Sequence, residues 1–204
     1  MTMKRRRRKF RPSLKFSPYA WAKLLFLRDQ GPTEIGGFGI ARDDDPLFID
    51  DVVVVRQSCT AVTVKFDDTA VADFFDEQID LGRKPEQFAR VWIHTHPGDS
   101  AQPSLTDERT FDRVFGHCDW AVMAILARGG ESYARLRFNT GPTADVLIGT
   151  RVVWSEPFAS SDQVSWLAEY KASVNEEASL VTTGPSRAGL LDDFDEQDFE
   201  MAFW

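Results

Sequence analysis

Cysteine is scarce in this sequence: its 204 residues include only Cys59 and Cys118, and these two do not form a CxxC pair. A disulfide framework needs several cysteines, and a structural zinc knuckle needs closely spaced thiols. The scarcity therefore excludes both classes of small, cross-linked fold. We expect both thiols to be reduced and buried.

Long hydrophobic runs are also lacking. No stretch approaches the roughly 18 consecutive apolar residues of a membrane-spanning helix. The first residues, MTMKRRRRKFRPSLKF, are basic but are not followed by the apolar segment of a secretory signal. The sequence thus predicts a cytoplasmic protein without a membrane partner.

The net charge of −8 conceals two ends of opposite sign. Residues 1–15 contain eight basic residues and no acidic one, whereas LLDDFDEQDFEMAFW at residues 190–204 contains six carboxylates, four aromatic side chains and no base. Such segments are usually solvated tails that contact partners, here by charge complementarity, or the aromatic residues fold back over an apolar groove. Nucleic acid is not an expected partner, because no nucleic-acid motif follows the basic segment.

The length suits one well-buried core with extensions rather than two full domains. We assign a basic N-terminal arm (1–13), a main domain (14–154), a C-terminal helical extension and linker (155–189) and an acidic aromatic tail (190–204). Apolar periodicity predicts helices at 17–31, 67–82, 104–115 and 161–180, and strands at 34–41, 47–57, 61–66, 88–96, 119–127, 132–139 and 144–154. Residues 47–57 and 61–66 are expected to pair. This order is typical of an α/β fold with a mixed central β-sheet flanked by helices.

One stretch, VWIHTHPGDSAQPSLTD at residues 91–107, carries the features of a metal site. Residues i and i+2 of a strand face the same way, so His94 and His96 can present two imidazoles to one ion. A catalytic zinc usually takes three protein ligands and leaves one position for water. Asp107, about one turn into the next helix, is the expected third ligand. Ser104 either caps that helix or turns its hydroxyl towards the metal-bound water.

An ordinary structural explanation exists for each of these residues alone. A strand histidine is often a satisfied core residue, and serine followed by an acid is a common helix start. The combined spacing HxHx7SxxD, however, would arise by chance in roughly one of a few thousand shuffled sequences of this composition. The remaining histidine, His117, lies beside Cys118, and a core or surface role is favoured there over a second metal site.

The combination of Glu34, a long gap and HTHPGDSAQPSLTD resembles the signature of the JAMM metalloproteases, the catalytic branch of the JAB1/MPN/Mov34 domain. The upstream pattern E-x-x-G is present at residues 34–37. The resemblance covers residues 14–154 and implies the JAB1/MPN fold. It also implies one catalytic Zn²⁺ with His94, His96 and Asp107 as ligands, Glu34 as general base, and Ser104 as hydrogen-bond donor to the oxyanion.

The implied activity is cleavage of a peptide or isopeptide bond after the C-terminal tail of a ubiquitin-like protein, in deconjugation or precursor processing. A small domain of this kind is similar to bacterial deubiquitinase-like members, so E1-like and E2-like conjugation proteins are expected partners. The extended substrate tail would be held by an edge strand after Asp107 or by the segment at residues 81–88. The alternatives are a non-catalytic MPN scaffold, or a JAMM hydrolase acting on a sulfur-carrier protein or a small amide.

Overall fold

In the computed structural model, residues 11–177 are described. Most of the basic arm (residues 1–10) and all of the acidic aromatic tail lie outside the described residues. The helices are α1 (Pro18–Arg28), α2 (Asp68–Asp80), α3 (Pro85–Phe88), α4 (Leu105–Phe115) and α5 (Gln163–Ser173). The strands are β1 (Ser13–Phe16), β2 (Gly36–Ala41), β3 (Phe48–Val53), β4 (Gln57–Cys59), β5 (Val64–Phe66), β6 (Val91–His96), β7 (Trp120–Ala127), β8 (Ser132–Phe138), β9 (Ala144–Leu147), β10 (Gly149–Val152) and β11 (Val174–Glu176).

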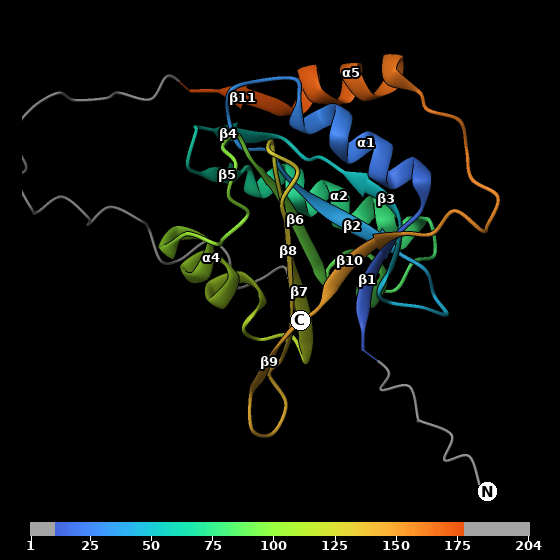
Figure 1. Ribbon diagram of the computed structural model, residues 1–204, viewed down its shortest axis with the longest axis vertical. Coiled ribbons are helices and arrows are strands. Elements are labelled where there is room, and N and C mark those ends of the chain that lie inside the picture. The colour runs from blue at the N-terminus through green and yellow to red at the C-terminus, as the bar shows by residue number, and fades with distance from the viewer. Residues whose placement is uncertain (1–10, 178–204) are drawn as a thin grey trace, which may run out of the picture.

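The main sheet has eight strands in the order β10-β1-β3-β2-β6-β7-β8-β9 (Figure 1). The pairs β10·β1, β1·β3 and β6·β7 are parallel, and the other four are antiparallel. A smaller sheet has the order β11-β4-β5. The expected α/β fold with a mixed central sheet is therefore confirmed.

Helices cover both faces of the main sheet, and each face has its own core. On one face, α1 packs against the sheet with Leu14, Phe16, Ile49 and Ile93 among the buried residues. On the other face, α2, α3 and α4 enclose a larger and more aromatic core. That core includes Phe38, Val71, Phe74, Phe88, Trp92, Phe111, Phe115 and Met123. The predicted strand at residues 88–96 thus becomes β6, buried between two apolar layers.

Local signals set the helix starts as the sequence indicates. Ser17 accepts a hydrogen bond from the N–H of Ala20 at 3.0 Å and Pro18 occupies the first turn of α1. Asp67 caps α2 in the same way, with the N–H of Ala70 at 2.9 Å. Side-chain acceptors at these positions satisfy N–H groups that have no partner within the helix.

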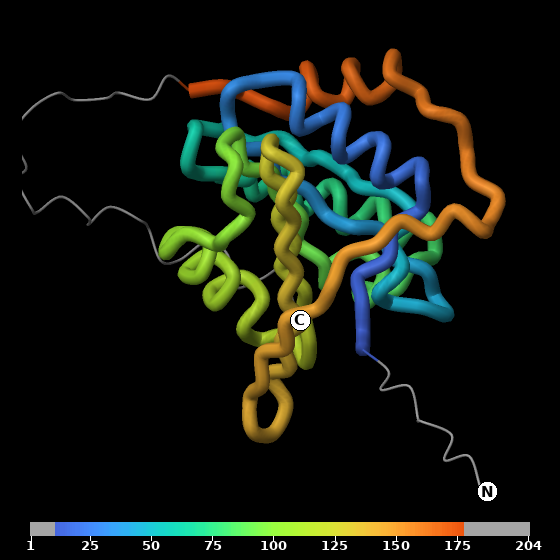
Figure 2. Tube along the Cα trace, viewed as in Figure 1, coloured from blue at the N-terminus to red at the C-terminus, as the bar shows by residue number. Residues whose placement is uncertain are grey.

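The C-terminal helix α5 lies beside α1 (Figure 2). Trp166 is 2% exposed and donates a hydrogen bond from Nε1 to the Tyr19 hydroxyl at 3.0 Å. The ammonium of Lys23 on α1 lies 2.7 Å from Glu169 on α5 and 3.3 Å from Asp51 on β3. The contacts of α5 therefore join the C-terminal extension to the body of the domain.

Three sequence predictions of secondary structure were wrong in detail. The range 47–57 divides into β3 and β4, and β5 pairs with β4, whereas β3 pairs with β1 and β2. The range 144–154 divides at Ile148, whose N–H donates to the Ala134 carbonyl on β8. The predicted helix 161–180 ends at Ser173, where β11 begins. Within the segment 81–88, which we expect as one possible binding site for the substrate tail, Pro85–Phe88 form α3.

The prediction missed β1 as well, in the residues just before α1. The two divided ranges share one cause, because a continuous apolar run does not reveal where one strand ends and the next begins. Val54 and Val55 are 5% and 6% exposed although they lie between strands. Tertiary packing, and not local preference, decides these boundaries.

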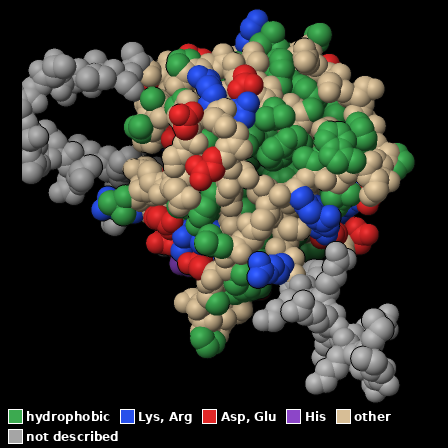
Figure 3. All heavy atoms as spheres, viewed as in Figure 1, with side chains coloured by type: hydrophobic (Ala, Val, Ile, Leu, Met, Phe, Trp, Pro, Cys, Tyr) green, Lys and Arg blue, Asp and Glu red, His purple; other side chains and the backbone are tan. Residues whose placement is uncertain are grey.

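The surface in Figure 3 mixes basic, acidic and apolar side chains, with the broadest apolar area over α1 and the segment between β10 and α5. Two exposed aromatic residues, Trp154 and Phe158, contact each other edge to face in that segment, with ring centroids 6.1 Å apart. No helix in the part of the chain that the structure describes is long and apolar enough to cross a membrane.

Candidate metal centre

Strand β6 presents Trp92, His94 and His96 to the face of the sheet that α4 covers. Their side chains follow the alternation of a strand, so all three lie on one side. The ring of Trp92 stacks on the imidazole of His94 with centroids 4.3 Å apart, and packs against Phe111 and Phe115 of α4. His94 is fully buried, whereas His96 at the strand end is 12% exposed. The aromatic core therefore fixes the inner histidine, and the outer one faces the surface.

The first turn of α4 holds the carboxylate. The N–H of Asp107 donates to Oγ of Ser104 at 3.1 Å, and the N–H of Ser104 donates to Oδ2 of Asp107 at 2.6 Å, which is a reciprocal capping box. This arrangement turns the Asp107 carboxylate back towards the helix start. Oδ1 then lies 3.3 Å from Nε2 of His94, and Oδ2 lies 3.6 Å from Nε2 of His96.

The three side chains have the composition of a metal site. One ligand atom from each of His94, His96 and Asp107 can be chosen so that all lie within 4.8 Å of one another. Both ring nitrogens of His94 and Nε2 of His96 are buried without a hydrogen-bond partner. Buried polar atoms of this kind cost free energy unless something satisfies them. Two imidazoles and one carboxylate are a known donor set for catalytic zinc, so the residues fit a divalent cation.

The outer histidine is oriented by the loop that follows β6. Nδ1 of His96 lies 2.9 Å from the carbonyl oxygen of Ser100, which can only accept a hydrogen bond. Nδ1 is therefore the protonated nitrogen of the neutral ring, and Nε2 carries the lone pair. That lone pair faces Asp107 and Glu34, where a cation would lie.

Glu34 lies just before β2 and is 5% exposed. Its Oε1 is 3.6 Å from Nε2 of His96, and its Oε2 is buried without a hydrogen-bond partner. Burial raises the pKa of Glu34 to about 8, helped by the charge of Asp107 and opposed by His96. In the protein alone, this carboxyl group therefore takes up and releases a proton near neutral pH.

The pKa values of the neighbouring groups shift in directions that follow from their contacts. Burial lowers the pKa of His94. Burial would raise the pKa of Asp107, but the adjacent imidazoles of His94 and His96 outweigh it and hold that pKa below its ordinary value. Burial also opposes protonation of His96, yet Asp107, the Ser100 carbonyl and Glu34 together raise its pKa. The site thus favours a charged Asp107 as its permanent anion.

The structure brings together all five residues singled out from the sequence. His94, His96 and Asp107 form the group, Glu34 faces His96, and Ser104 is joined to Asp107. Sequence reasoning missed the supporting residues Trp92, Thr95, Ser100 and Gln57. Trp92 could have been found from its i−2 position to His94 on the predicted strand, but nothing in the sequence marks Gln57.

The third histidine takes no part in such a group. His117 is exposed, while Cys118 is buried and accepts a hydrogen bond from Nη1 of Arg90 at 2.8 Å. Within residues 11–177, His94, His96 and Asp107 form the only set of three or more potential metal ligands that lie close enough to hold an ion.

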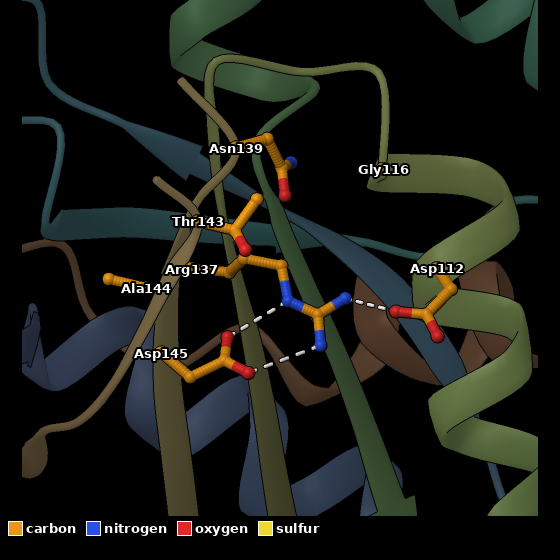
Figure 4. A pocket seen from close by; sticks show the side chains of 7 residues that line it. All are labelled: Asp112, Gly116, Arg137, Asn139, Thr143, Ala144 and Asp145. Carbon is orange, nitrogen blue, oxygen red and sulfur yellow. Dashed lines mark hydrogen bonds and ion pairs between the residues drawn. The ribbon is translucent and has the colours of Figure 1, made fainter. Parts of the chain in front are cut away.

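A separate hollow of about 380 Å³ lies towards the C-terminal end of α4, between that helix and the β8–β9 hairpin (Figure 4). It is lined by Asp112, Gly116, Arg137, Asn139, Thr143, Ala144 and Asp145. Figure 4 shows the Arg137 guanidinium between two carboxylates, those of Asp112 and Asp145. Its charge is neutralised within the protein, so this hollow is a structural ion-pair site.

The chain was compared with known proteins. No curated protein matches it. The family model described as prokaryotic homologs of the JAB domain matches residues 22–139, which is more than half of the chain and includes Glu34, the two histidines of β6 and the first turn of α4. The chain therefore belongs to the family of prokaryotic homologs of the JAB domain.

Proposed function

We propose that this protein is a JAMM-type zinc metalloprotease that cleaves the peptide or isopeptide bond after the C-terminal tail of a ubiquitin-like protein. The observation that carries the proposal is the arrangement of Glu34 opposite a buried group of two histidines and one aspartate. A scaffold without activity would not need a buried acid beside a complete ligand set.

His94, His96 and Asp107 would hold the zinc ion. When bound, zinc supplies a Lewis acid that polarises the scissile carbonyl and lowers the pKa of water. The protein supplies the orientation of its ligands, because Trp92 fixes His94, the Ser100 carbonyl fixes His96, and the capping box fixes Asp107. Groups that orient metal ligands in this way matter for metal affinity as well as for activity.

Glu34 would act as general base and then as general acid. A carboxylate within reach of the reacting atoms can both take and return a proton. Its carboxylate would accept the proton of the attacking water and pass it to the leaving amine. The burial of Glu34 keeps bulk water away from this proton.

Ser104 would stabilise the oxyanion. Its Oγ accepts the hydrogen bond from the Asp107 N–H, so the hydroxyl proton remains available for donation. Ser104 is exposed at the start of α4, so its hydroxyl is accessible from the surface. A preorganised donor at the position of the developing charge contributes strongly to amide hydrolysis.

The proposed substrate follows from family membership together with the form of the site. We infer that an extended, small-residue tail reaches the Glu34 carboxylate, which is buried just before β2. Such a tail would lie in extended form beside the site, a mode in which main-chain hydrogen bonds provide affinity. A ubiquitin-like protein with its E1-like and E2-like conjugation enzymes would then be the physiological partners.

The test combines metal analysis with cleavage. Zinc content is measured by elemental analysis in the wild type and in His96→Ala, and both are incubated with a ubiquitin-like protein that carries a C-terminal extension. We expect about one zinc per wild-type chain, chelator-sensitive cleavage directly after the tail, and loss of both in His96→Ala. Absence of zinc from the wild type would instead indicate a scaffold.

A second assay tests whether the enzyme prefers a protein substrate or a small molecule. The zinc-loaded enzyme is given a small amide whose structure matches the last residues of the tail. Faster turnover of the small amide than of the protein fusion would replace the proposed substrate class. The Glu34→Gln variant serves as the inactive control in both arms.

A further inference from the structure

Successive main-chain groups at Glu34 and Ile35 form hydrogen bonds to two different neighbours, the β4–β5 hairpin and strand β6. The N–H of Glu34 donates to the Thr60 carbonyl at 2.8 Å, on the side of the β4–β5 hairpin. Ile35 faces β6 instead, where its N–H donates to Oγ1 of Thr95 at 3.1 Å and its carbonyl accepts from the Thr95 N–H at 2.9 Å. Glu34 is thus bonded to the hairpin side, and the next residue, Ile35, is bonded to β6.

Gly36 continues the alternation but lacks a strand on one side. Strand β2 pairs with β6 from Gly36, opposite His94, whereas its pairing with β3 begins only at Phe38, opposite Val53. A side chain takes the place of the missing strand. Oε1 of Gln57 accepts the Gly36 N–H at 2.8 Å, and Nε2 of Gln57 donates to the Gly36 carbonyl at 2.8 Å.

Gln57 is itself fixed. It is 2% exposed, its Nε2 also donates to the Val55 carbonyl at 2.8 Å, and its Oε1 also accepts from Sγ of Cys59 at 3.2 Å. All four hydrogen-bonding positions of the carboxamide are therefore used. Strand β4, which carries Gln57, is paired on both edges, with β5 antiparallel and β11 parallel.

The hairpin also packs directly on Gly36. A Cβ atom at this position would lie 2.8 Å from Cζ of Phe66 and 2.8 Å from Cγ1 of Val64, closer than side chains approach. The absence of a side chain at Gly36 lets β5 cover it while Gln57 reaches its peptide groups. On the side away from β6, Gly36 is therefore covered by Gln57 of β4 and by Val64 and Phe66 of β5.

We propose that Gln57 is a positioning residue for the general base. Its carboxamide hydrogen-bonds to the N–H and the carbonyl of Gly36 and so sets where the Glu34 carboxylate lies relative to His96. This inference rests on the proposed function. The Gln57 carboxamide bonds to main-chain groups of Gly36 and Val55 and to the Cys59 thiol, so it acts on Glu34 through Ile35, the one residue between Gly36 and Glu34. A carboxylate that is displaced by about 1 Å loses a large part of its catalytic effect.

The experiment uses the full zinc-loaded chain with Gln57→Met, which keeps the shape of the side chain but removes both hydrogen bonds to Gly36. Gln57→Asn, one methylene shorter, is the milder variant. The probe is a ubiquitin-like protein with a C-terminal extension. We expect a 10- to 100-fold decrease in kcat for Gln57→Met, a smaller decrease for Gln57→Asn, KM within about twofold, and unchanged zinc stoichiometry.

A second measurement does not depend on the substrate. Hydrogen exchange at the Gly36 amide should become at least about tenfold faster in Gln57→Met, because its acceptor is gone. Crystal structures of both zinc-loaded proteins should show the Glu34 carboxylate displaced relative to His96. An unchanged kcat, or an unmoved Glu34 carboxylate in the variant, overturns the proposal.

Two controls separate positioning from general loss of stability. Ser58→Ala, on the same strand, should change none of these quantities. Val71→Ala removes buried side-chain volume from α2 and should lower Tm without lowering kcat. If Val71→Ala lowers kcat as much as Gln57→Met, the effect of Gln57 is only structural.

The outcomes distinguish this inference from the proposed function. If the wild type and Glu34→Gln are equally inactive, the proposed function fails, and the exchange and crystallographic measurements still decide whether Gln57 positions Glu34. If Glu34→Gln is inactive while Gln57→Met keeps wild-type turnover, only the positioning role fails.

Discussion

Replacing Glu34 by glutamine should stabilise the metal-free protein at neutral pH. The pKa of this buried carboxyl is raised from an ordinary value of 4.5 to about 8. Between these values the unfolded chain is ionised while the folded protein must hold a proton or bury a charge. Folding is therefore penalised progressively as the pH rises above about 4.5, and glutamine, which is neutral and of similar shape, avoids the penalty.

The magnitude follows from linkage. Because the folded pKa is above the unfolded one, the stability contribution is complete below pH 4.5 and is lost as the pH rises to 8. At pH 7 the interval is about 2.5 units, which at about 1.4 kcal/mol per unit gives about 3 kcal/mol. For a chain of this size that corresponds to about 6–12 °C in Tm.

The assay is thermal unfolding by circular dichroism in the presence of a chelator, at several values between pH 4.5 and pH 8. Glu34→Gln should match the wild type at the acidic end and exceed it by an increasing margin towards pH 8. Glu77→Gln, an exposed position on α2, is the matched control and should show no such trend. A constant or decreasing margin with rising pH would refute the burial argument.

Three further predictions concern the metal, the cap and the buried thiol. Zinc at a free concentration of 100 Kd should increase the free energy of unfolding of the wild type by about 3 kcal/mol, which a thermal titration would show as a higher Tm. His96→Ala should abolish this increase in Tm. Ser104→Ala should cost about 1 kcal/mol in denaturant unfolding from the lost cap and also lower kcat, whereas Ser104→Thr should restore most of both; an unchanged kcat in Ser104→Ala would argue against its oxyanion role. Burial raises the pKa of Cys59 to about 12, so iodoacetamide at pH 8 should label it only after unfolding, as peptide mass spectrometry would detect; labelling of the folded protein would contradict its burial.

Much of the site could be predicted because its signals are local. Two histidines at i and i+2 need only a strand to face the same way, and β6 provides it. The capping box of Ser104 and Asp107 is encoded within four residues, and the same box that starts α4 turns the carboxylate towards the histidines. For these residues, the spacing in the sequence already determines the geometry.

The assignment of Glu34 depended on family resemblance instead of local chemistry. The chain contains eleven glutamates, and no local pattern shows that this one is buried beside His96. Its approach requires that β2 pair with β6 so that Gly36 lies opposite His94. The raised pKa follows from that pairing, because burial is a property of the assembled sheet.

The sequence by itself determined the α/β class, the main helices and the residues of the candidate metal centre, because periodicity, caps and ligand spacing act over a few residues. Only the tertiary structure decided that the chain passes from the main sheet to the smaller sheet between residues 53 and 57, and that β11 pairs with β4. It also decided that the Gln57 carboxamide replaces a strand beside Gly36. These features depend on contacts between distant segments. Their free energy comes from packing and from the satisfaction of buried main-chain groups, neither of which leaves a periodic trace in the sequence.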